Sequence, residues 1–199
     1  GLDVELINEP TAAVLHYANL PGVSINGRVL IFDLGGGTFD ISIANVKGKK
    51  VDVITSVGDK HLGGRRFDEE IINILDKKYK KAKGKGLDNP LKDEKLFTIA
   101  ERIKKILSNK EKATEIIEGP KGPHKIDVSR KEFEDSIDTY IEKIKMLMEE
   151  ALERANCKPN NISQTLLVGG STRMPIISQT ITKIMKKAPV KGVNVDEAV

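Results

Sequence analysis

The sequence predicts an α/β fold on three observations. Short apolar runs between residues 29 and 57 are typical of strands. From Asp68 onward, apolar residues recur every three or four positions, as they do on the buried face of a helix. Near the end, the strand-like run Thr165–Val168 leads through a glycine-containing loop into a helix from Pro175 to about Lys187. The 199 residues suffice for one or two compact domains.

The composition indicates a soluble, helix-rich chain, with 31% charged residues, 4% aromatic residues and no Trp. No apolar run approaches the roughly 20 residues of a membrane span, and the N-terminus lacks a signal-peptide pattern. Cys157 is the only cysteine, which excludes an internal disulfide and fits the cytoplasm or another reducing compartment. His16, His61 and His124 are scattered, so no metal-ligand spacing occurs.

A cluster of lysines between Lys77 and Lys85 contributes to the net charge of +4. Such a cluster can bind nucleic acid, but this one lacks interleaved aromatic residues, and the sequence contains no nucleic-acid-reading motif. Runs of charge usually form solvated helix ends and loops. We interpret the cluster in that way, and we expect neither a nucleic-acid partner nor a membrane partner.

The first predicted elements are a strand, Leu2–Ile7, and a helix from Pro10 to about Ala18. Proline fits the first turn of a helix because its missing N–H is no loss there. Glu9 lies at the start of this helix, where the helix dipole favours an acidic side chain.

A glycine-rich bend joins the next two predicted strands, Val29–Phe32 and Phe39–Val46, which we expect to pair as a hairpin with Val51–Val57 as a third strand. The bend holds Gly35, Gly36 and Gly37. Without Cβ atoms, its backbone N–H groups can turn toward one anion, such as a phosphate. The flanking residues Asp33 and Asp40 suit a hydrated divalent cation. The alternative is a hairpin that merely turns, with two solvated aspartates. Neither the P-loop signature nor the Rossmann signature is present.

Two helices follow the turn-rich stretch of residues 58–64. The first carries one apolar face, formed by Phe67, Ile71, Leu75 and Tyr79. The second is expected from about Lys92 to Ser108, with Leu96, Ile99, Ile103 and Ile106 turned inward. Its polar face carries Glu101, Lys104, Lys105 and Ser108, which are spaced three or four residues apart. From spacing alone, such a face is usually a set of solvated, weak ion pairs.

The segment Ile116–Val128 predicts two short strands around a glycine- and proline-rich turn. Ser129 with Glu132 is a capping-box signature, which predicts one long helix that reaches Ala155. Met146 and Met148 within it are interpreted as core filler.

The loop Gly169–Arg173 lies directly before the last helix, whose N-terminus can face an anion or a base. The planar guanidinium of Arg173 can stack on a purine ring. The alternative is an ordinary βα turn in which Arg173 makes a surface pair.

Four stretches together resemble the seventy-kilodalton heat-shock chaperones, the DnaK family, in order along the chain. They are Ile7–Ala13, Asp33–Asp40, Leu167–Pro175 and Asn194–Val199. The resemblance implies lobe two of the nucleotide-binding domain. A ribonuclease-H-like (actin-like ATPase) subdomain would comprise residues 1–62 and 138–199, with a mostly helical α+β subdomain inserted at 63–137. Residues 1–26 would supply the inter-lobe strand and crossover helix. A first lobe is expected before residue 1 and a peptide-binding domain after residue 199.

The resemblance also implies a role for particular residues. The β- and γ-phosphates of ATP or ADP would lie on the bend, and the catalytic and metal-side groups would be Asp33, Glu9 and Thr38, with Asp40 helping to order Mg²⁺, K⁺ and water. Glu101 and Lys104 would bind the ribose. The remaining nucleotide contacts would come from Gly35, Gly36, Gly37, Thr38, Gly64, Lys105, Ser108, Gly169, Gly170, Ser171, Arg173 and Asp196.

The chain departs from the family pattern in three places. Lys105 replaces an arginine that stacks better on adenine. Arg65 and Arg66 stand where the family usually has an acidic residue or Asn, and then Asp. These two cations either favour the binding of phosphate in the nucleotide cleft or change the surface that an exchange factor would contact. Val195 replaces a proline, and the acidic residue that follows it in the family is retained as Asp196.

The resemblance implies that the parent protein is an ATP-dependent chaperone that hydrolyses ATP to drive protein folding. J-domain co-chaperones, nucleotide-exchange factors and unfolded client peptides would be its partners. The chain alone is expected to be inactive or nearly so as an ATPase. The alternatives are a sugar or acetate kinase of the actin-like superfamily and a non-enzymatic domain that binds nucleic acid.

Overall fold

The computed structural model describes residues 7–19, 24–48 and 50–190. The expected strand Leu2–Ile7 lies outside the described residues except for Ile7, which belongs to neither a helix nor a strand. The stretch Asn194–Val199, with Asp196, also lies outside them.

One half of the molecule is built on a mixed four-stranded sheet in the order β3-β2-β1-β6. The strands are β1 (Gly27–Leu34), β2 (Phe39–Lys47), β3 (Lys50–Asp59) and β6 (Gln164–Val168). The first three are antiparallel neighbours, whereas β1 and β6 run parallel. The predicted hairpin around the glycine bend is therefore confirmed.

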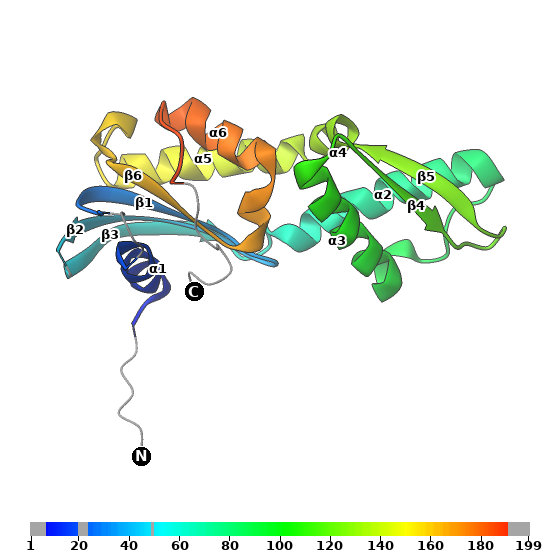
Figure 1. Cartoon of the computed structure of the whole chain (residues 1–199), viewed down its shortest axis with the longest axis horizontal. Helices are drawn as coiled ribbons and strands as arrows, with labels where there is room; N and C mark the ends of the chain where they lie inside the picture. Colours follow the sequence, from blue (N-terminus) through cyan, green and yellow to red (C-terminus); the bar gives the residue numbers. More distant parts are fainter. Residues whose placement is uncertain (1–6, 20–23, 49, 191–199) are drawn as a thin grey trace, which may run out of the picture.

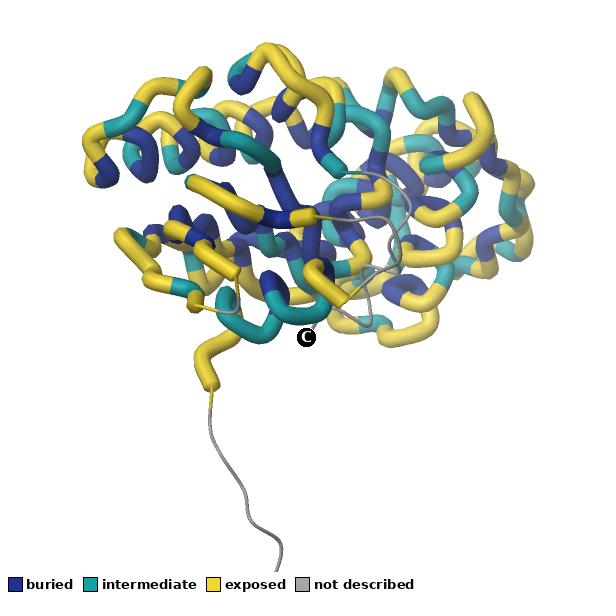
Figure 2. The backbone as a smooth tube through the Cα atoms, turned by 60° about the vertical axis from the view of Figure 1, so that its left-hand side comes forward, coloured by how far each residue is buried: buried dark blue, intermediate teal, exposed yellow. Residues whose placement is uncertain are grey.

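Helices cover both faces of this sheet (Figure 1). Helix α1 (Glu9–Ala18) lies on one face, and α5 (Asp138–Arg154) and α6 (Pro175–Met185) lie on the other. Side chains of β1 alternate between the faces, so that Val29 and Ile31 pack on the α1 side and Leu30 and Phe32 on the opposite side. Figure 2 shows the resulting buried backbone between exposed outer turns.

The other half extends the molecule along its longest axis (Figure 1). It contains α2 (Gly64–Lys83), the 3₁₀ turn η1 (Pro90–Lys92), α3 (Glu94–Asn109) and α4 (Arg130–Ser136), with the antiparallel hairpin of β4 (Lys112–Ile117) and β5 (His124–Ser129). One continuous apolar cluster joins this half to the sheet. Two further 3₁₀ turns are η2 (Pro159–Asn161) and η3 (Gly170–Arg173). No helix within the described ranges is long and apolar enough to cross a bilayer.

In two places the helices differ from the sequence prediction by more than two residues. Helix α2 begins at Gly64 rather than near Asp68, because contacts with the glycine bend supply acceptors for its first N–H groups. The single helix expected from Ser129 to Ala155 is two helices, α4 and α5, with a break at Ile137 (φ −101°, ψ 6°). The apolar period continues through the break, since Ile137 itself is fully buried, and periodicity alone cannot detect the change.

The structure also tests the predicted cap at Ser129 and the predicted burial of two methionines. The Ser129 cap is confirmed, because its hydroxyl accepts a hydrogen bond of 3.1 Å from the Glu132 N–H. Met148 is buried as expected, but Met146 is 68% exposed and is not core filler. The division of the chain at residues 62/63 and 137/138 stays a prediction.

Tyr17 fixes α1 to the open edge of the sheet. Its ring is fully buried, and its hydroxyl donates to the Leu167 carbonyl (2.6 Å) and accepts from the Leu167 N–H (3.0 Å). The hydroxyl therefore satisfies two backbone groups of edge strand β6, which would be costly to bury unpaired.

We expect Tyr17→Phe to lower the free energy of unfolding by about 1–3 kcal/mol, because it leaves both backbone groups of Leu167 without that partner. Urea denaturation measures the change. Tyr140→Phe is the matched control, because the contact of the Tyr140 hydroxyl with Glu70 is long, at 3.4 Å. Equal losses in the two variants would show that the bridge contributes nothing particular.

Candidate functional site

The glycine bend is closed by one hydrogen bond, 3.1 Å from the Gly35 N–H to the Thr38 carbonyl. None of its three glycines has a positive φ. A Cβ added to Gly36 or Gly37 would meet nothing within 4 Å. The fold itself therefore does not require glycine at these two positions. Space left open above a backbone is what the close approach of a ligand needs.

The carbonyl groups of the bend hold two distant segments in place. The Gly35 carbonyl accepts hydrogen bonds from the Gly64 N–H (2.9 Å) and the Ser171 hydroxyl (3.0 Å), and the Gly36 carbonyl accepts one from the Arg65 N–H (2.7 Å). The start of α2 and the turn η3 are thus fixed against the hairpin.

Two other glycines are needed for this close approach. A Cβ on Gly63 would lie 2.6 Å from the Gly37 carbonyl carbon. Gly169 has a φ of +85°, and a Cβ there would overlap the Leu34 carbonyl. In contrast to Gly36 and Gly37, these positions are constrained by the fold.

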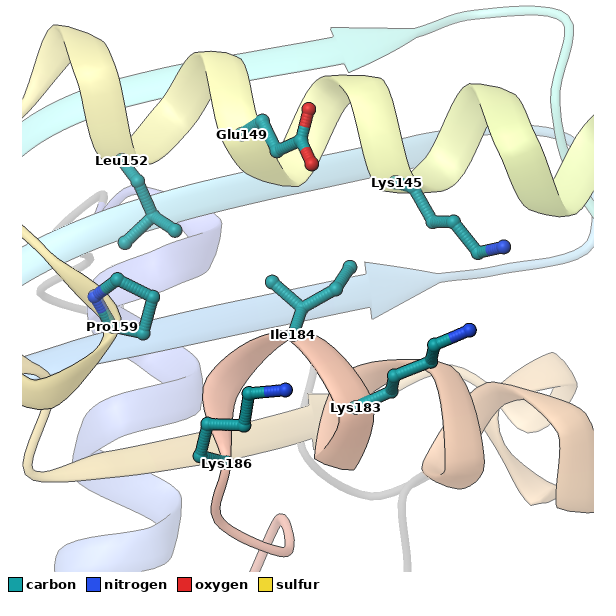
Figure 3. Close-up of a pocket in the computed structure, with 7 residues that line it drawn as sticks. All are labelled: Lys145, Glu149, Leu152, Pro159, Lys183, Ile184 and Lys186. Atoms are coloured by element: carbon teal, nitrogen blue, oxygen red, sulfur yellow. The ribbon is translucent and has the colours of Figure 1, made fainter.

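A pocket of about 520 Å³ lies elsewhere, between α5 and α6 (Figure 3). Three lysines, Lys145, Lys183 and Lys186, line this α5–α6 pocket together with Glu149. None of the residues singled out in the sequence lines it, and Lys145 is already paired with Glu142 (2.5 Å).

The larger pocket, of about 970 Å³, is bounded by the glycine bend, the start of α2, one side of α3 and the turn η3; we call it the α2–α3 pocket. It brings together nine of the residues predicted to bind nucleotide, namely Gly36, Gly64, Glu101, Lys104, Lys105, Ser108, Gly170, Ser171 and Arg173. The other members of the predicted set within the described ranges, Gly35, Gly37, Thr38 and Gly169, belong to the same bend and loop without lining the pocket.

Helical spacing indicated that Lys104 lies on a solvated face, but the structure buries this side chain. It is only 9% exposed, and its ammonium lies 2.8 Å from Asp68 Oδ1 and donates to the Gly64 carbonyl (3.0 Å). Burial raises the pKa of Asp68, and the neighbouring Lys104 opposes this rise. Asp68 was not among the site residues predicted from the sequence, although an acidic residue beside the apolar stripe of α2 was a signal.

Lys105 and Glu101 are paired with each other across one helical turn, at 2.8 Å. Both side chains are more than half exposed, so the pair contributes little to stability. Hydrogen bonding to Lys105 lowers the pKa of Glu101. Both groups line the α2–α3 pocket and are held by a contact that a ligand can replace.

The predicted metal-side carboxylates do not line that pocket. Glu9, Asp33 and Asp40 line a separate carboxylate pocket of about 170 Å³, together with Ser42, Ser56 and two apolar residues. It lies where the start of α1 meets β1, β2 and β3. Asp33 and Asp40 face each other as partners in the strand ladder, and the glycine bend that joins their strands reaches the α2–α3 pocket through Gly36.

Negative charge is crowded in the carboxylate pocket. Burial raises the pKa of Asp33 to about 7, and the charge of Glu9, a hydrogen bond with Glu9 and the charge of Asp40 add to the rise. Burial and Glu9 also raise the pKa of Asp40, while Lys60 opposes that shift. A cation would relieve this repulsion.

The kind of cation is limited by the arrangement of these side chains. Within residues 7–19, 24–48 and 50–190, no group of three His, Cys, Asp or Glu side chains is arranged to hold a bare metal ion. The carboxylates of Glu9, Asp33 and Asp40 suit Mg²⁺, which keeps several waters and takes few protein ligands.

Residues 1–199 match a protein-family model described as Hsp70 protein. The match covers the whole chain, and the mixed sheet with helices on both faces fits the actin-like ATPase fold.

We expect Asp33→Asn to stabilise the protein at pH 8 and to have little effect near pH 5. A carboxyl group whose pKa is raised to about 7 binds more protons in the folded than in the unfolded state, so the parent loses stability as pH rises from about 4 to 7. Asn avoids that loss. Because the group is partly exposed, the gain at pH 8 is about 1 kcal/mol. Thermal unfolding at both pH values measures it.

The control is Asp59→Asn, because hydrogen bonding to Lys143 lowers the pKa of Asp59. This substitution should destabilise the protein at pH 8. A destabilised Asp33→Asn at pH 8 would contradict the crowding of charge around Asp33.

Proposed function

The chain belongs to the Hsp70 family, and on this premise we propose that it is lobe two of the nucleotide-binding domain of a DnaK-type, ATP-dependent chaperone. Hsp70 proteins are an ATPase family of chaperones. The lobe assignment rests on the motif content, namely one phosphate bend, one adenosine-type helix and one glycine-containing loop before a helix.

One observation carries the proposal. The glycine bend, α3 and the turn η3 lie far apart in the sequence, yet residues from all three line the α2–α3 pocket. The residues gathered there supply glycine backbone with open space beside it, a buried cation and exposed polar side chains. A nucleotide needs such a combination of phosphate and sugar contacts.

In the proposed complex, the ribose lies against Glu101 and Lys104. Lys104 is already fixed by Asp68 and Gly64, so its position costs no ordering when the ligand binds. Glu101 exchanges its contact with Lys105 for a ribose hydroxyl, and Lys105 is then released toward the base. Ser108 and Arg173 are the other base contacts.

The phosphates lie at the glycine bend, from Gly35 to Thr38, beside the carboxylate pocket. When bound, Mg²⁺ neutralises phosphate charge there, and K⁺ is the second ion. Asp33, Glu9 and Asp40 would hold these ions through their water shells, and Asp33, Glu9 and Thr38 would orient the attacking water. We propose that hydrolysis requires the first lobe as well.

The partners in general follow from the family, which works with co-chaperones and clients. We propose J-domain co-chaperones, nucleotide-exchange factors and unfolded client peptides, in the cytoplasm or another reducing compartment. The match of all 199 residues to the Hsp70 model favours a chaperone over a sugar or acetate kinase, and we expect no nucleic-acid partner.

Gly36→Ala should weaken ADP binding at least about tenfold, because a Cβ would fill the space where phosphate approaches the backbone. Its fold should remain, with a gain of about 0.4–1 kcal/mol from the stiffer unfolded chain. NMR titration of the purified chain with ADP and thermal unfolding measure the two effects. The parent is expected to bind in the millimolar range, which is about −4 kcal/mol.

Gly63→Ala is the matched variant for the fold. Its Cβ would clash with Gly37, so it should destabilise the protein by about 1–3 kcal/mol. If Gly36→Ala binds ADP as the parent does, the phosphate assignment at the bend is wrong.

The chain alone should not hydrolyse ATP at a useful rate. Phosphoryl transfer depends on positioned cations and a site shielded from water, and in the proposed mechanism the first lobe supplies a second phosphate loop, another metal-side aspartate and a lysine. Steady-state phosphate release, with Asp33→Asn beside the parent, tests this. A substantial rate that Asp33→Asn abolishes would overturn the two-lobed mechanism.

A further inference from the structure

Arg65 and Arg66 are adjacent in the sequence, but the structure gives them different surroundings. Arg65 lines the α2–α3 pocket, and Arg66 does not. The Arg66 side chain donates to the His61 carbonyl (3.2 Å) and to Glu69 (2.7 Å). Only one of the two cations is therefore available to a ligand in the pocket.

Arg65 is held both at its backbone and at its guanidinium. Its N–H donates to the Gly36 carbonyl, and its guanidinium carbon lies 4.1 Å from the centroid of the Phe97 ring. A guanidinium with one face on an aromatic ring is held in orientation, while its edge N–H groups stay available as donors.

Those donors are not used within the protein. Among the described residues, the guanidinium of Arg65 makes no hydrogen bond; its ion pair with Glu94 is 3.8 Å long, with the two side chains 58% and 80% exposed. At that exposure, solvent screens the attraction strongly. By contrast, Lys104 and Lys105, which also line the pocket, each have an acidic partner at 2.8 Å.

The position of Arg65 indicates which part of a ligand it can contact. Its backbone touches the glycine bend, and Phe97, beneath its guanidinium, lies one helical turn before Glu101 on α3. The guanidinium therefore lies on the side of Glu101 away from Ser108, which is the side opposite to the proposed base.

We propose that Arg65 is a phosphate-binding side chain of the α2–α3 pocket, which exchanges Glu94 for oxygens of the 5′-diphosphate of a nucleotide. This inference rests on the function proposed above. A guanidinium forms paired, charge-assisted hydrogen bonds with phosphate oxygens, and leaving a weak, exposed ion pair costs little. Arg65 then determines a preference for nucleotides with more than one phosphate.

The test compares ADP with adenosine, which lacks phosphate, in NMR titrations of the chain. We expect Arg65→Gln to weaken ADP binding about 3-fold to 10-fold and to leave adenosine binding within about twofold. The salt dependence of ADP binding should become less steep, since one screened charge contact is lost. Arg65→Lys, which keeps the charge, should retain part of the affinity.

Two matched controls each remove one positive charge elsewhere. Arg66→Gln removes the neighbouring guanidinium, which does not line the pocket, and Lys183→Gln removes a cation of the α5–α6 pocket (Figure 3). Both should bind ADP as the parent does. Thermal unfolding of every variant confirms that the chain is folded.

The outcomes separate this inference from the proposed function. If the parent binds ADP and Arg65→Gln binds it equally well, Arg65 is not a phosphate contact, although the proposed function stands. An equal loss of ADP and adenosine binding, or an equal loss in Arg66→Gln, also overturns the inference. If the parent binds neither ADP nor adenosine, the proposed function fails first, and the inference fails with it.

Discussion

The carbonyl groups of Gly35 and Gly36 are the junction on which the rest of the structure depends. They accept hydrogen bonds from the backbone of α2 and from the Ser171 side chain, and α2 leads away from the sheet into the other half of the molecule (Figure 1). The bend has open space beside Gly36 and Gly37, and its carbonyl groups fix the pocket walls. Any ligand on the bend rests on the group that sets the geometry of those walls.

The buried pair of Lys104 and Asp68 is a second constraint, and it acts between helices. It ties α3 to α2 inside the wall of the α2–α3 pocket, where Lys104 also donates to the Gly64 carbonyl. A buried ion pair of this kind stabilises little in net terms, because both charges lose their hydration. The pair instead fixes the position of α3 relative to α2, since removal of either partner would leave an uncompensated charge beside the bend.

Local patterns in the sequence predicted most of the fold, because the strands and helices follow the period of their own apolar residues. The hairpin around the bend and the apolar face of α2 are confirmed. The break at Ile137 could not be predicted, since the same side chains are buried whether the helix is one or two.

The candidate site was predicted where motifs lie at the ends of elements, as at Gly36 and Ser171. What depends on tertiary packing was missed. Helical spacing placed Lys104 on a polar face, but Asp68, on another helix, draws it into the interior. Likewise, neighbouring helix residues such as Arg65 and Arg66 point about 100° apart, and only the seating of α2 decides which one faces the pocket.

The bridge between Tyr17 and Leu167 gives α1 a mechanical consequence. Glu9, at the beginning of α1, lines the carboxylate pocket, while Tyr17, near its end, grips β6 two residues before Gly169. A helix of ten residues is a stiff rod of about 15 Å. Helix α1 is therefore a single rigid connection between the carboxylate pocket and the strand that leads into the turn η3.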